Sequence, residues 1–303
     1  RITYDEAFDR YGSDKPDIRF DHELIDITDT AQKSSFNIIA DEAYTGAVVA
    51  PEALSRSDID RFEEEAVTHG ADGLLYMKRD EAGDVSGPLT SHVDVDRFVN
   101  ALGLGRDETA LIIAGRKRKA QDILGELRLK IRDNYDLTDP ENHAFVWVTD
   151  FPLFEWDEDD GWVPAHHIFT MPDEEHVDTF ADNPGDALSQ SYDLALNGIE
   201  LGSGSIRVTD PDLQRELLDF IGVGEEEAEE KFGFLLDAYQ YGAPIHGGIA
   251  LGLERVCALL TGKNDIRDVI AFPKNQQARS PMDGSPTPID SEVLDELGLR
   301  IDD

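Results

Sequence analysis

A run of glycines near the C-terminus constrains this chain more than any other feature. Residues 247–255 read GGIALGLER: a glycine pair, small and apolar residues, a third glycine, then an acid and an arginine. Glycine lets the backbone approach a flat ligand closely, because it has no Cβ. An arginine at the start of the following helix can reach phosphates with a planar, permanently charged fork. The run predicts a strand feeding a helix at a nucleotide site, with Leu253, Val256, Cys257 and Leu260 turned inward.

A predicted hairpin upstream carries two acids. In SYDLALNGIELGSGS, Asn197-Gly198 is a typical two-residue hairpin turn, and Asp193 and Glu200 lie on either side of it. If residues 192–196 form a strand, the two acids face each other across the turn. Carboxylate oxygens there would suit Mg²⁺ bound to ATP phosphates. The alternative is that they are ordinary strand-end acids in a chain with 65 acidic residues.

Arg207 and a histidine pair are the other candidate site residues. Arg207 ends the segment GSGSIR, where an arginine on the pocket face could pair bidentately with a carboxylate. His166-His167 has no zinc-ligand spacing around it, so a metal site is not expected there. The alternatives are a surface ion pair for Arg207 and histidines packed beside Trp162 and Phe169.

The net charge restricts the partners of the chain. It is −38, from 65 acidic and 27 basic residues. Phosphate binding needs Lys and Arg, so any nucleic-acid contact must be local. We interpret the acid excess and scarce lysine as adaptation to high salt, where charges are screened. The cluster RKRK at 116–119 is the densest basic run; it is interpreted as a solvated helix start, with phosphate contact as the alternative.

Length and hydrophobic pattern indicate one large domain or two. No apolar run approaches a membrane span, and the single cysteine, Cys257, excludes an internal disulfide framework, which favours the cytoplasm. Thr3 begins a capping-box pattern, and Ser57 is expected to cap a helix that ends at Gly70. Strands and helices alternate without a regular βαβ period. This pattern favours an α+β fold with a mainly antiparallel sheet and helices packed on it.

Several segments together resemble a known family. GGIALGLERV, NGIELGSGSIR at 197–207 and AHHIFTMP at 165–172 resemble the second half of bacterial-type aspartyl-tRNA synthetases, which are class II enzymes; the first is similar to their motif 3. RYGSDKPDIRF at 10–20 resembles the segment after motif 2. THGADGLLYMK and ILGELRLKI resemble parts of the GAD insertion domain.

The resemblance implies a domain organisation. Residues 1–22 would belong to the catalytic domain, 23–134 to a GAD-like α+β insertion domain, and 135–303 to the C-terminal part of a class II catalytic domain with motif 3. Its fold would be the class II antiparallel sheet flanked by helices. The anticodon-binding domain, motif 1 with the dimer interface, and motif 2 would precede Arg1. The isolated chain is therefore expected to be inactive.

The resemblance also implies roles for the candidate residues. Glu200 would bind metal and ATP, and Asp193 would be a metal-associated acid. Arg207 would hold the side-chain carboxylate of aspartate, with His166 over the bound substrate on a mobile loop. Arg255 would reach the ATP phosphates. Its neighbours would shape the adenine pocket: Gly252, Leu253 and Glu254.

The implied function is activation of L-aspartate with ATP and Mg²⁺, followed by transfer to tRNA(Asp), in a homodimeric cytoplasmic enzyme. Charging of asparagine is an alternative, against which Arg207 and the GAD-like insertion count. A truncated or non-catalytic paralogue is another. A binding protein with a GAD domain, like the archaeal Glu-tRNA amidotransferase, is disfavoured by the intact Glu200, Arg207 and Arg255. Charging of tRNA(Asn) as well remains open on these residues.

Overall fold

A computed structural model describes residues 1–263 and 265–301. The chain divides into two compact units, residues 1–250 and residues 251 onward, and each is described by itself. The elements in chain order are β1 (Ile2–Thr3), α1 (Tyr4–Tyr11), β2 (Ile25–Asp26), α2 (Thr28–Ala31), α3 (Asn37–Ala40), β3 (Tyr44–Ala50), α4 (Arg56–Thr68), β4 (Leu75–Arg79), β5 (Val85–Ser86), α5 (Val95–Leu102), β6 (Glu108–Gly115), α6 (Lys117–Asn134), β7 (Phe145–Pro152), β8 (Phe154–Asp157), β9 (Gly161–Pro164), β10 (Leu188–Leu196), β11 (Ile199–Ile206), α7 (Pro211–Phe220), α8 (Glu225–Gln240), β12 (Gly247–Leu251), α9 (Leu253–Leu260), the 3-10 helix η1 (Ile266–Asp268) and α10 (Ser291–Leu297).

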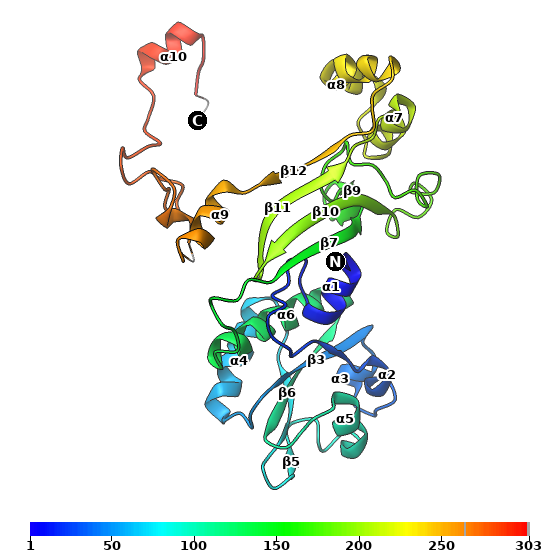
Figure 1. The fold of residues 1–303 in the computed structure, drawn as a ribbon, viewed down its shortest axis with the longest axis vertical. Coiled ribbons are helices and arrows are strands. Elements are labelled where there is room, and N and C mark those ends of the chain that lie inside the picture. The colour runs from blue at the N-terminus through cyan, green and yellow to red at the C-terminus, as the bar shows by residue number, and fades with distance from the viewer. Residues whose placement is uncertain (264, 302–303) are drawn as a thin grey trace. The chain divides into compact units, whose positions relative to one another are not determined.

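One sheet has the strand order β1-β7-β10-β11-β12 (Figure 1). The pairs β7–β10 and β10–β11 are antiparallel, and the short β1 runs parallel to β7. The mainly antiparallel arrangement predicted from the sequence is therefore confirmed. We call this the hairpin sheet, because the β10–β11 hairpin carries the candidate site residues.

The β10–β11 hairpin turns where the sequence predicts. Asn197 and Gly198 form the two-residue connection, with φ of 54° and 87°. Two successive positive φ values are the geometry of a type I′ turn, whose twist matches that of the strands it joins. The Asn-Gly pair is the preferred sequence for this turn, and the prediction is confirmed.

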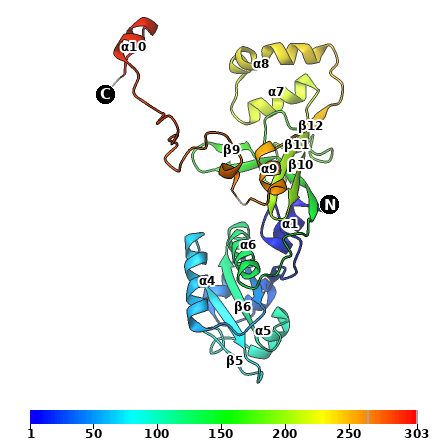
Figure 2. The same cartoon turned by 60° about the vertical axis from the view of Figure 1, so that its left-hand side comes forward.

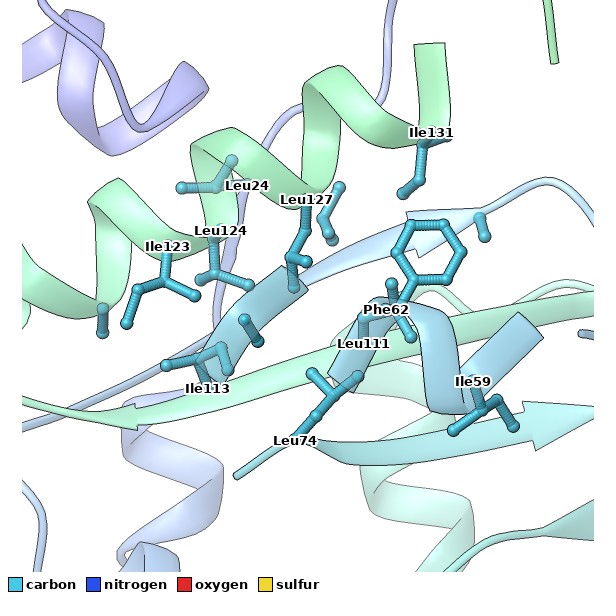
Figure 3. Close-up of a cluster of buried hydrophobic side chains, with 14 of the residues drawn as sticks. Leu24, Ile59, Phe62, Leu74, Leu111, Ile113, Ile123, Leu124, Leu127 and Ile131 are labelled. Atoms are coloured by element: carbon cyan, nitrogen blue, oxygen red, sulfur yellow. The ribbon is translucent and has the colours of Figure 1, made fainter. Parts of the chain in front are cut away.

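A second sheet has the order β2-β3-β6-β4-β5, and its neighbouring strands pair antiparallel throughout. Helices α4 and α6 cover one face and α5 the other (Figure 2), and α2 and α3, labelled in Figure 1, pack on the same face as α5. Alternate residues of the central strand β6 therefore enter two cores: Leu111 and Ile113 on one side, Ala110 and Ile112 on the other. Figure 3 shows the first core, where Phe62 packs with the leucines and isoleucines of α6. We call this the insertion sheet.

The helix starts follow local sequence, with one correction. The hydroxyl of Thr3 accepts a hydrogen bond from the Glu6 amide, so the predicted cap of α1 is confirmed. The predicted cap Ser57 is wrong, because Ser55 caps α4. Ser55 and Asp58 form a complete capping box, which leaves Ser57 inside the first turn.

The basic run at 116–119 forms the start of α6, as interpreted from the sequence. Two of its residues contact α1: Lys117 lies 2.8 Å from Asp9, and Arg118 lies 3.0 Å from Asp5. The guanidinium of Arg118 also stacks over the ring of Phe8 at 3.9 Å. These contacts attach α6 to α1. The domain boundaries at 22/23 and 134/135 stay a prediction.

The second unit contains α9, η1 and α10. The strand-to-helix transition predicted for the glycine run is confirmed, since β12 is followed by α9 after Gly252. The prediction that Leu253 and Leu260 turn inward is wrong here: their exposed fractions are 68% and 82%. Helical spacing predicts which residues form the apolar stripe of α9, but it does not predict whether another surface covers that stripe. Within residues 1–263 and 265–301, the helices are too short or too polar to cross a membrane.

Candidate active site on the hairpin sheet

One face of the β10–β11 hairpin carries a row of buried polar side chains. Along β10 these are Ser191 and Asp193, which pair with Ser205 and Ser203 on β11. Side chains two apart on a strand share a face, so the four lie together. Asp193 is only 4% exposed, and Ser191 and Ser205 are also buried. Buried polar groups are costly unless satisfied, so such a row indicates either an internal network or a binding site.

The two candidate acids meet differently from the prediction. Asp193 pairs with Ser203, and Glu200 pairs with Ala195, so the acids are not direct cross-strand partners. The register shifts between Leu194 and Ala195, which leaves Leu201 as an extra residue on β11. A bulge of this kind changes which side chains share a face. Here it brings Ser203, and not Gly202, opposite Asp193. Glu200 lies on the face of Asp193 because its partner Ala195 is two residues from Asp193 on β10, and its charge acts on the Asp193 carboxyl.

Asp193 is in a strained electrostatic environment. Burial raises the pKa of its carboxyl above the ordinary value, and the Glu200 and Asp14 carboxylates raise it further. A hydrogen bond from Ser203 and the nearby His166 act in the opposite direction. Its Oδ1 is buried and accepts no hydrogen bond from any described residue. An unsatisfied buried carboxylate oxygen is the expected partner for a cation or donor that binds from outside.

Arg207 lies just beyond the end of β11. Its backbone N–H donates to the carbonyl of His246 at 3.0 Å, and it forms an isolated bridge with Thr170. Nη1 of its guanidinium is buried and has no hydrogen-bond acceptor in the described part of the chain. A guanidinium with an unused donor at a polar face can bind a carboxylate. The alternative of a surface ion pair is not seen among the described residues.

The two histidines interact electrostatically with different candidate residues: His166 with Asp193, and His167 with Arg207. The ring of His166 packs edge-on against Phe151, with centroids 4.7 Å apart, and lowers the pKa of Asp193. Burial lowers the pKa of His167, and the charge of Arg207 lowers it further. The ring of His167 lies 5.5 Å from that of Phe169, as the packing alternative predicted. The structure therefore brings His166, Asp193, Glu200 and Arg207 to one region of the first unit.

The glycines of GSGS and of the GG pair serve strand packing. A Cβ at Gly204 would lie 2.1 Å from the carbonyl oxygen of Gly248, so no larger residue fits there. The hydroxyl of Tyr192 also donates to that carbonyl, at 3.0 Å. The close backbone approach expected at these glycines occurs, but between β11 and β12.

Gly252, Leu253, Glu254 and Arg255 lie in the second unit. Gly252 precedes α9 with extended backbone, and the three others form the first turn of the helix. The amide groups of a first helical turn have no partners within the helix and suit an anion. Whether these residues share a pocket with Glu200 stays a prediction.

The hairpin offers a small set of metal ligands. Among the described residues, no group of three or more His, Cys, Asp or Glu could hold a metal ion. Asp193 and Glu200 supply two carboxylates, one with an unsatisfied oxygen. Mg²⁺ is usually held by one or two carboxylates with water and substrate phosphates, so this pair fits a phosphate-bound Mg²⁺ and no dedicated metal cage.

Sequence reasoning missed two contributors. Ser203 donates to Asp193, and Asp14 raises the pKa of that carboxyl from a segment far away in sequence. The alternation of serine and glycine in GSGS was a signal for Ser203, because it places Ser203 and Ser205 on one strand face. Nothing local to Asp14 indicates its closeness to β10.

Comparison with known proteins identifies the family. Residues 1–276 match the family described as tRNA synthetases class II (D, K and N). The chain is 42% identical over 314 residues to the aspartate–tRNA(Asp/Asn) ligase of Anoxybacillus flavithermus, covering 100% of this chain and 53% of that protein. It is 43% identical over 312 residues to the aspartate–tRNA ligase of Bacillus licheniformis, covering 99% of this chain and 52% of the relative. The chain thus spans about half the length of the curated relatives it matches.

Among solved structures, an aspartyl-tRNA synthetase from Entamoeba histolytica is similar over 52% of this chain and 26% of its own. The identity is 27% and the TM-score 0.35. At this TM-score the likeness carries no argument about the site.

Proposed function

Since this chain belongs to the class II tRNA synthetases of the D, K and N group, we propose that it forms part of an aspartate–tRNA ligase. The enzyme would activate L-aspartate with ATP and transfer it to tRNA(Asp). Relatives more than 40% identical carry the name aspartate–tRNA ligase, and the chain spans about half of their length. The activity is accordingly proposed for a protein that joins this chain to the remainder found in those relatives.

The observation that most directly supports aspartate as substrate is the unused, buried Nη1 of Arg207. A substrate side-chain carboxylate would pair with it bidentately. The neutral amide of asparagine could not satisfy a buried guanidinium, so the site would discriminate against asparagine. His166, exposed and packed edge-on against Phe151, would cover the bound amino acid.

Asp193 and Glu200 would hold Mg²⁺ together with the ATP phosphates. The metal would neutralise the charge that develops as pyrophosphate leaves. This use of the pair accounts for the unsatisfied Oδ1 of Asp193 and its raised pKa, since a cation would relieve both. Catalysis would then consist of positioning and charge neutralisation, without a covalent enzyme intermediate.

Arg255 would contact the ATP phosphates from the first turn of α9, and Gly252, Leu253 and Glu254 would shape the adenine pocket. In the full-length gene product, Arg255→Ala should cost about 2–4 kcal/mol of transition-state stabilisation in the activation step, with folding intact. Unchanged exchange kinetics would remove Arg255 from the site.

The proposed function is tested by aspartate-dependent ATP–pyrophosphate exchange. The full-length gene product should exchange label with aspartate and not with asparagine, and tRNA(Asp) should be the acceptor. Residues 1–303 alone should not support exchange. Absence of exchange by the full-length product under saturating substrates would contradict the proposal.

A wider acceptor range is the second candidate. Relatives at 41–42% identity are named aspartate–tRNA(Asp/Asn) ligases, so we also propose tRNA(Asn) as a possible acceptor. Charging assays with both purified tRNAs distinguish the two. We further propose a cytoplasmic homodimer adapted to high salt, with residues 23–134 as a GAD-like insertion domain.

A further inference from the structure

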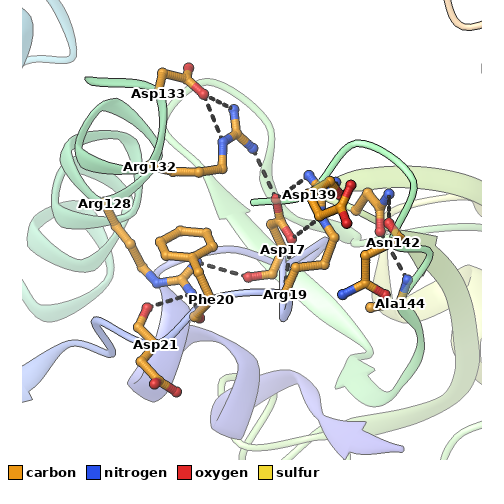
Figure 4. Close-up of polar contacts among 11 residues, drawn as sticks. Asp17, Arg19, Phe20, Asp21, Arg128, Arg132, Asp133, Asp139, Asn142 and Ala144 are labelled. Carbon is orange, nitrogen blue, oxygen red and sulfur yellow. Dashed lines mark hydrogen bonds and ion pairs between the residues drawn. The ribbon is translucent and has the colours of Figure 1, made fainter. Parts of the chain in front are cut away.

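An ion network around a fully buried carboxylate lies beside the tip of the β10–β11 hairpin. The Asp17 side chain has no exposed surface. Its Oδ1 accepts from Nε of Arg19 at 2.9 Å, and its Oδ2 accepts from Nη2 of Arg19 at 2.7 Å and Nη1 of Arg132 at 3.1 Å (Figure 4). Burial alone would raise the pKa of Asp17, but the hydrogen bonds from both arginines outweigh it and hold the pKa below its ordinary value.

The network joins segments that are far apart in sequence. Arg132 belongs to the last turn of α6, next to the insertion sheet, whereas Asp17 belongs to the segment that follows α1. One turn earlier on α6, the buried Arg128 stacks on the Phe20 ring at 3.7 Å. It also donates to the carbonyls of Asp17, Phe20 and Asp21 (Figure 4) and to that of His22. With four backbone acceptors held by one planar fork, the 17–22 segment is fixed on α6.

The hairpin turn rests on this network. A Cβ at Gly198 would lie 3.4 Å from the Asp17 Cβ and 3.9 Å from Nη1 of Arg132. The neighbouring Asn197 holds the other side of the turn: its Oδ1 accepts from the Ala144 amide and its Nδ2 donates to the Asn142 carbonyl, each at 3.0 Å. The turn is therefore held between the buried ion network and the chain that leads into β7.

Glu200 follows Gly198 by two residues, and the bulge at Leu201 comes directly after it. A one-residue slip at the turn would break the pairing of Glu200 with Ala195 and move Glu200 to the opposite face of the hairpin. Asp14, three residues before Asp17, is close enough to act on the Asp193 carboxyl, so the same segment passes both acids. We propose that Asp17 is a positioning residue that fixes the hairpin turn, so that Glu200 stays beside Asp193. Through its ion pair with Asp17, Arg132 connects the turn to α6 and the insertion sheet.

This inference rests on the proposed function for its kinetic consequence. Residues that orient metal ligands typically change metal affinity 10–100-fold when mutated. Asp17→Asn keeps the shape but removes the charge, leaving Arg19 and Arg132 without their shared carboxylate, although Arg132 keeps its ion pair with Asp133. In the full-length gene product we expect about a tenfold or greater rise in the Mg²⁺ concentration for half-maximal pyrophosphate exchange. The KM for aspartate should change little, because Arg207 is not at the turn.

Two glycines give a matched control. Gly198 and Gly222 have nearly equal φ, 87° and 85°, but a Cβ at Gly222 would meet no atom within 4 Å. An alanine Cβ at 198 would only reach van der Waals contact with Asp17, so a larger side chain is needed: Gly198→Leu and Gly222→Leu introduce similar backbone strain, and only the first adds atoms beyond a Cβ that already touches Asp17. Gly198→Leu should reproduce the Mg²⁺ shift of Asp17→Asn, and Gly222→Leu should leave the Mg²⁺ requirement unchanged. Equal shifts in both variants would overturn the proposal.

A second pair tests the link to the insertion. Arg132→Met removes one partner of Asp17, whereas Lys130→Met on the same helix removes only the 3.3 Å ion pair with Glu65. Arg132→Met should raise the Mg²⁺ requirement, and Lys130→Met should not. These variants keep the proposal testable if Asp17→Asn fails to fold. An unchanged Mg²⁺ requirement in Arg132→Met would show that Arg132 does not link the insertion to the hairpin.

Amide hydrogen exchange separates failure of this inference from failure of the proposed function. In the 303-residue chain, Asp17→Asn should accelerate exchange at the amides of 198–201 more than at the amides of α7. This measurement needs no enzymatic activity. If the wild-type protein proved inactive but the exchange pattern appeared, only the proposed function would fail. An active wild type with unchanged hairpin exchange in Asp17→Asn would refute the positioning role.

Discussion

The hairpin sheet and the insertion sheet each have five strands, but they differ in how their faces are filled. The insertion sheet is apolar on both faces, and its central strand β6 contributes fully buried residues to two cores. The hairpin sheet instead has a face with buried serines, a buried acid and, at its end, a buried guanidinium nitrogen without an acceptor. A face that leaves polar groups unsatisfied sacrifices stability, which is typical of binding sites. The contrast indicates that the insertion sheet stabilises the fold and that the hairpin sheet carries the candidate site.

The same contrast separates two buried carboxylates. Asp17 accepts hydrogen bonds from two arginines, and its pKa lies below the ordinary value. Asp193 has one oxygen without a partner among the described residues, and its pKa lies above the ordinary value. Burial acts in the same direction on both. The difference comes from pairing, so the satisfied acid belongs to the framework and the unsatisfied acid to the site.

The largest effect is expected from Arg207→Leu. This change keeps much of the bulk but removes the fork, so a bound substrate carboxylate would be buried without its partner. Breaking a buried ion pair costs roughly 3–5 kcal/mol. At about 1.4 kcal/mol per tenfold, kcat/KM for aspartate should fall by hundreds-fold or more in pyrophosphate exchange, with ATP affinity nearly unchanged.

Arg215→Leu is the matched control, because Arg215 on α7 is partly exposed and its ion pair in the described part of the chain is with the exposed Asp212. It should exchange as wild type does. If Arg207→Leu activated aspartate as well as wild type does, Arg207 would have a structural role. The hairpin sheet would then lose the residue proposed to bind the substrate.

A core change in the insertion sheet should affect stability without affecting recognition. Leu111 on β6 is fully buried, so Leu111→Ala should lower the free energy of unfolding by about 2–5 kcal/mol. Urea unfolding followed by circular dichroism measures this. Leu299→Ala, at a position 54% exposed, should change stability little. Under conditions where the variant stays folded, the preference for aspartate over asparagine should be unchanged; a changed preference would give the insertion sheet a part in the substrate site.

Local signals predicted the turn, the helix start and the strand-to-helix passage that depend on residues adjacent in sequence. Asn197-Gly198 identified the hairpin turn, Thr3 the start of α1, and the glycine run the passage from β12 to α9, because each depends on residues adjacent in sequence. The Ser55 cap could also have been found, since Ser55 and Asp58 have capping-box spacing. Choosing Ser57 overlooked that pairing.

What the sequence could not give depends on register and long-range packing. The extra residue Leu201 determines that Ser203, and not Gly202, lies opposite Asp193, and no local pattern reveals it. In the sequence, Asp17 is one of 65 acidic residues, and nothing distinguishes it, because its partner Arg132 is 115 residues away. The exposure of Leu253 shows the same limit, because helical spacing specifies a stripe without specifying what covers it.

Salt should act on the surface of the molecule and not on either sheet interior. With a net charge of −38, self-repulsion opposes folding at low ionic strength. At molar salt the Debye length is about 3 Å, so most of this repulsion is screened. The melting temperature should rise from low salt to molar KCl, measured by thermal denaturation at neutral pH. Near pH 4.3, the isoelectric point, the gain should be smaller. A melting temperature that is unchanged or lower in KCl would contradict the high-salt interpretation.

The smallest effect tests the unsatisfied acid itself. The folded chain binds the Asp193 proton more tightly than the unfolded chain, because burial raises the pKa of this carboxyl. Stability therefore falls as the pH rises above the unfolded value of about 3.9, and the loss is complete above the folded pKa. Asp193→Asn stays neutral and can still accept from Ser203. Without Mg²⁺, it should unfold at a modestly higher urea concentration than wild type at neutral pH, and the difference should vanish in acid.

Asp17 has the opposite shift, and its contribution to stability is present at neutral pH and lost as the pH falls through its lowered pKa. If Asp193→Asn were instead less stable than wild type at neutral pH, the Asp193 carboxylate would be satisfied within the fold, and the distinction between framework acid and site acid would fail.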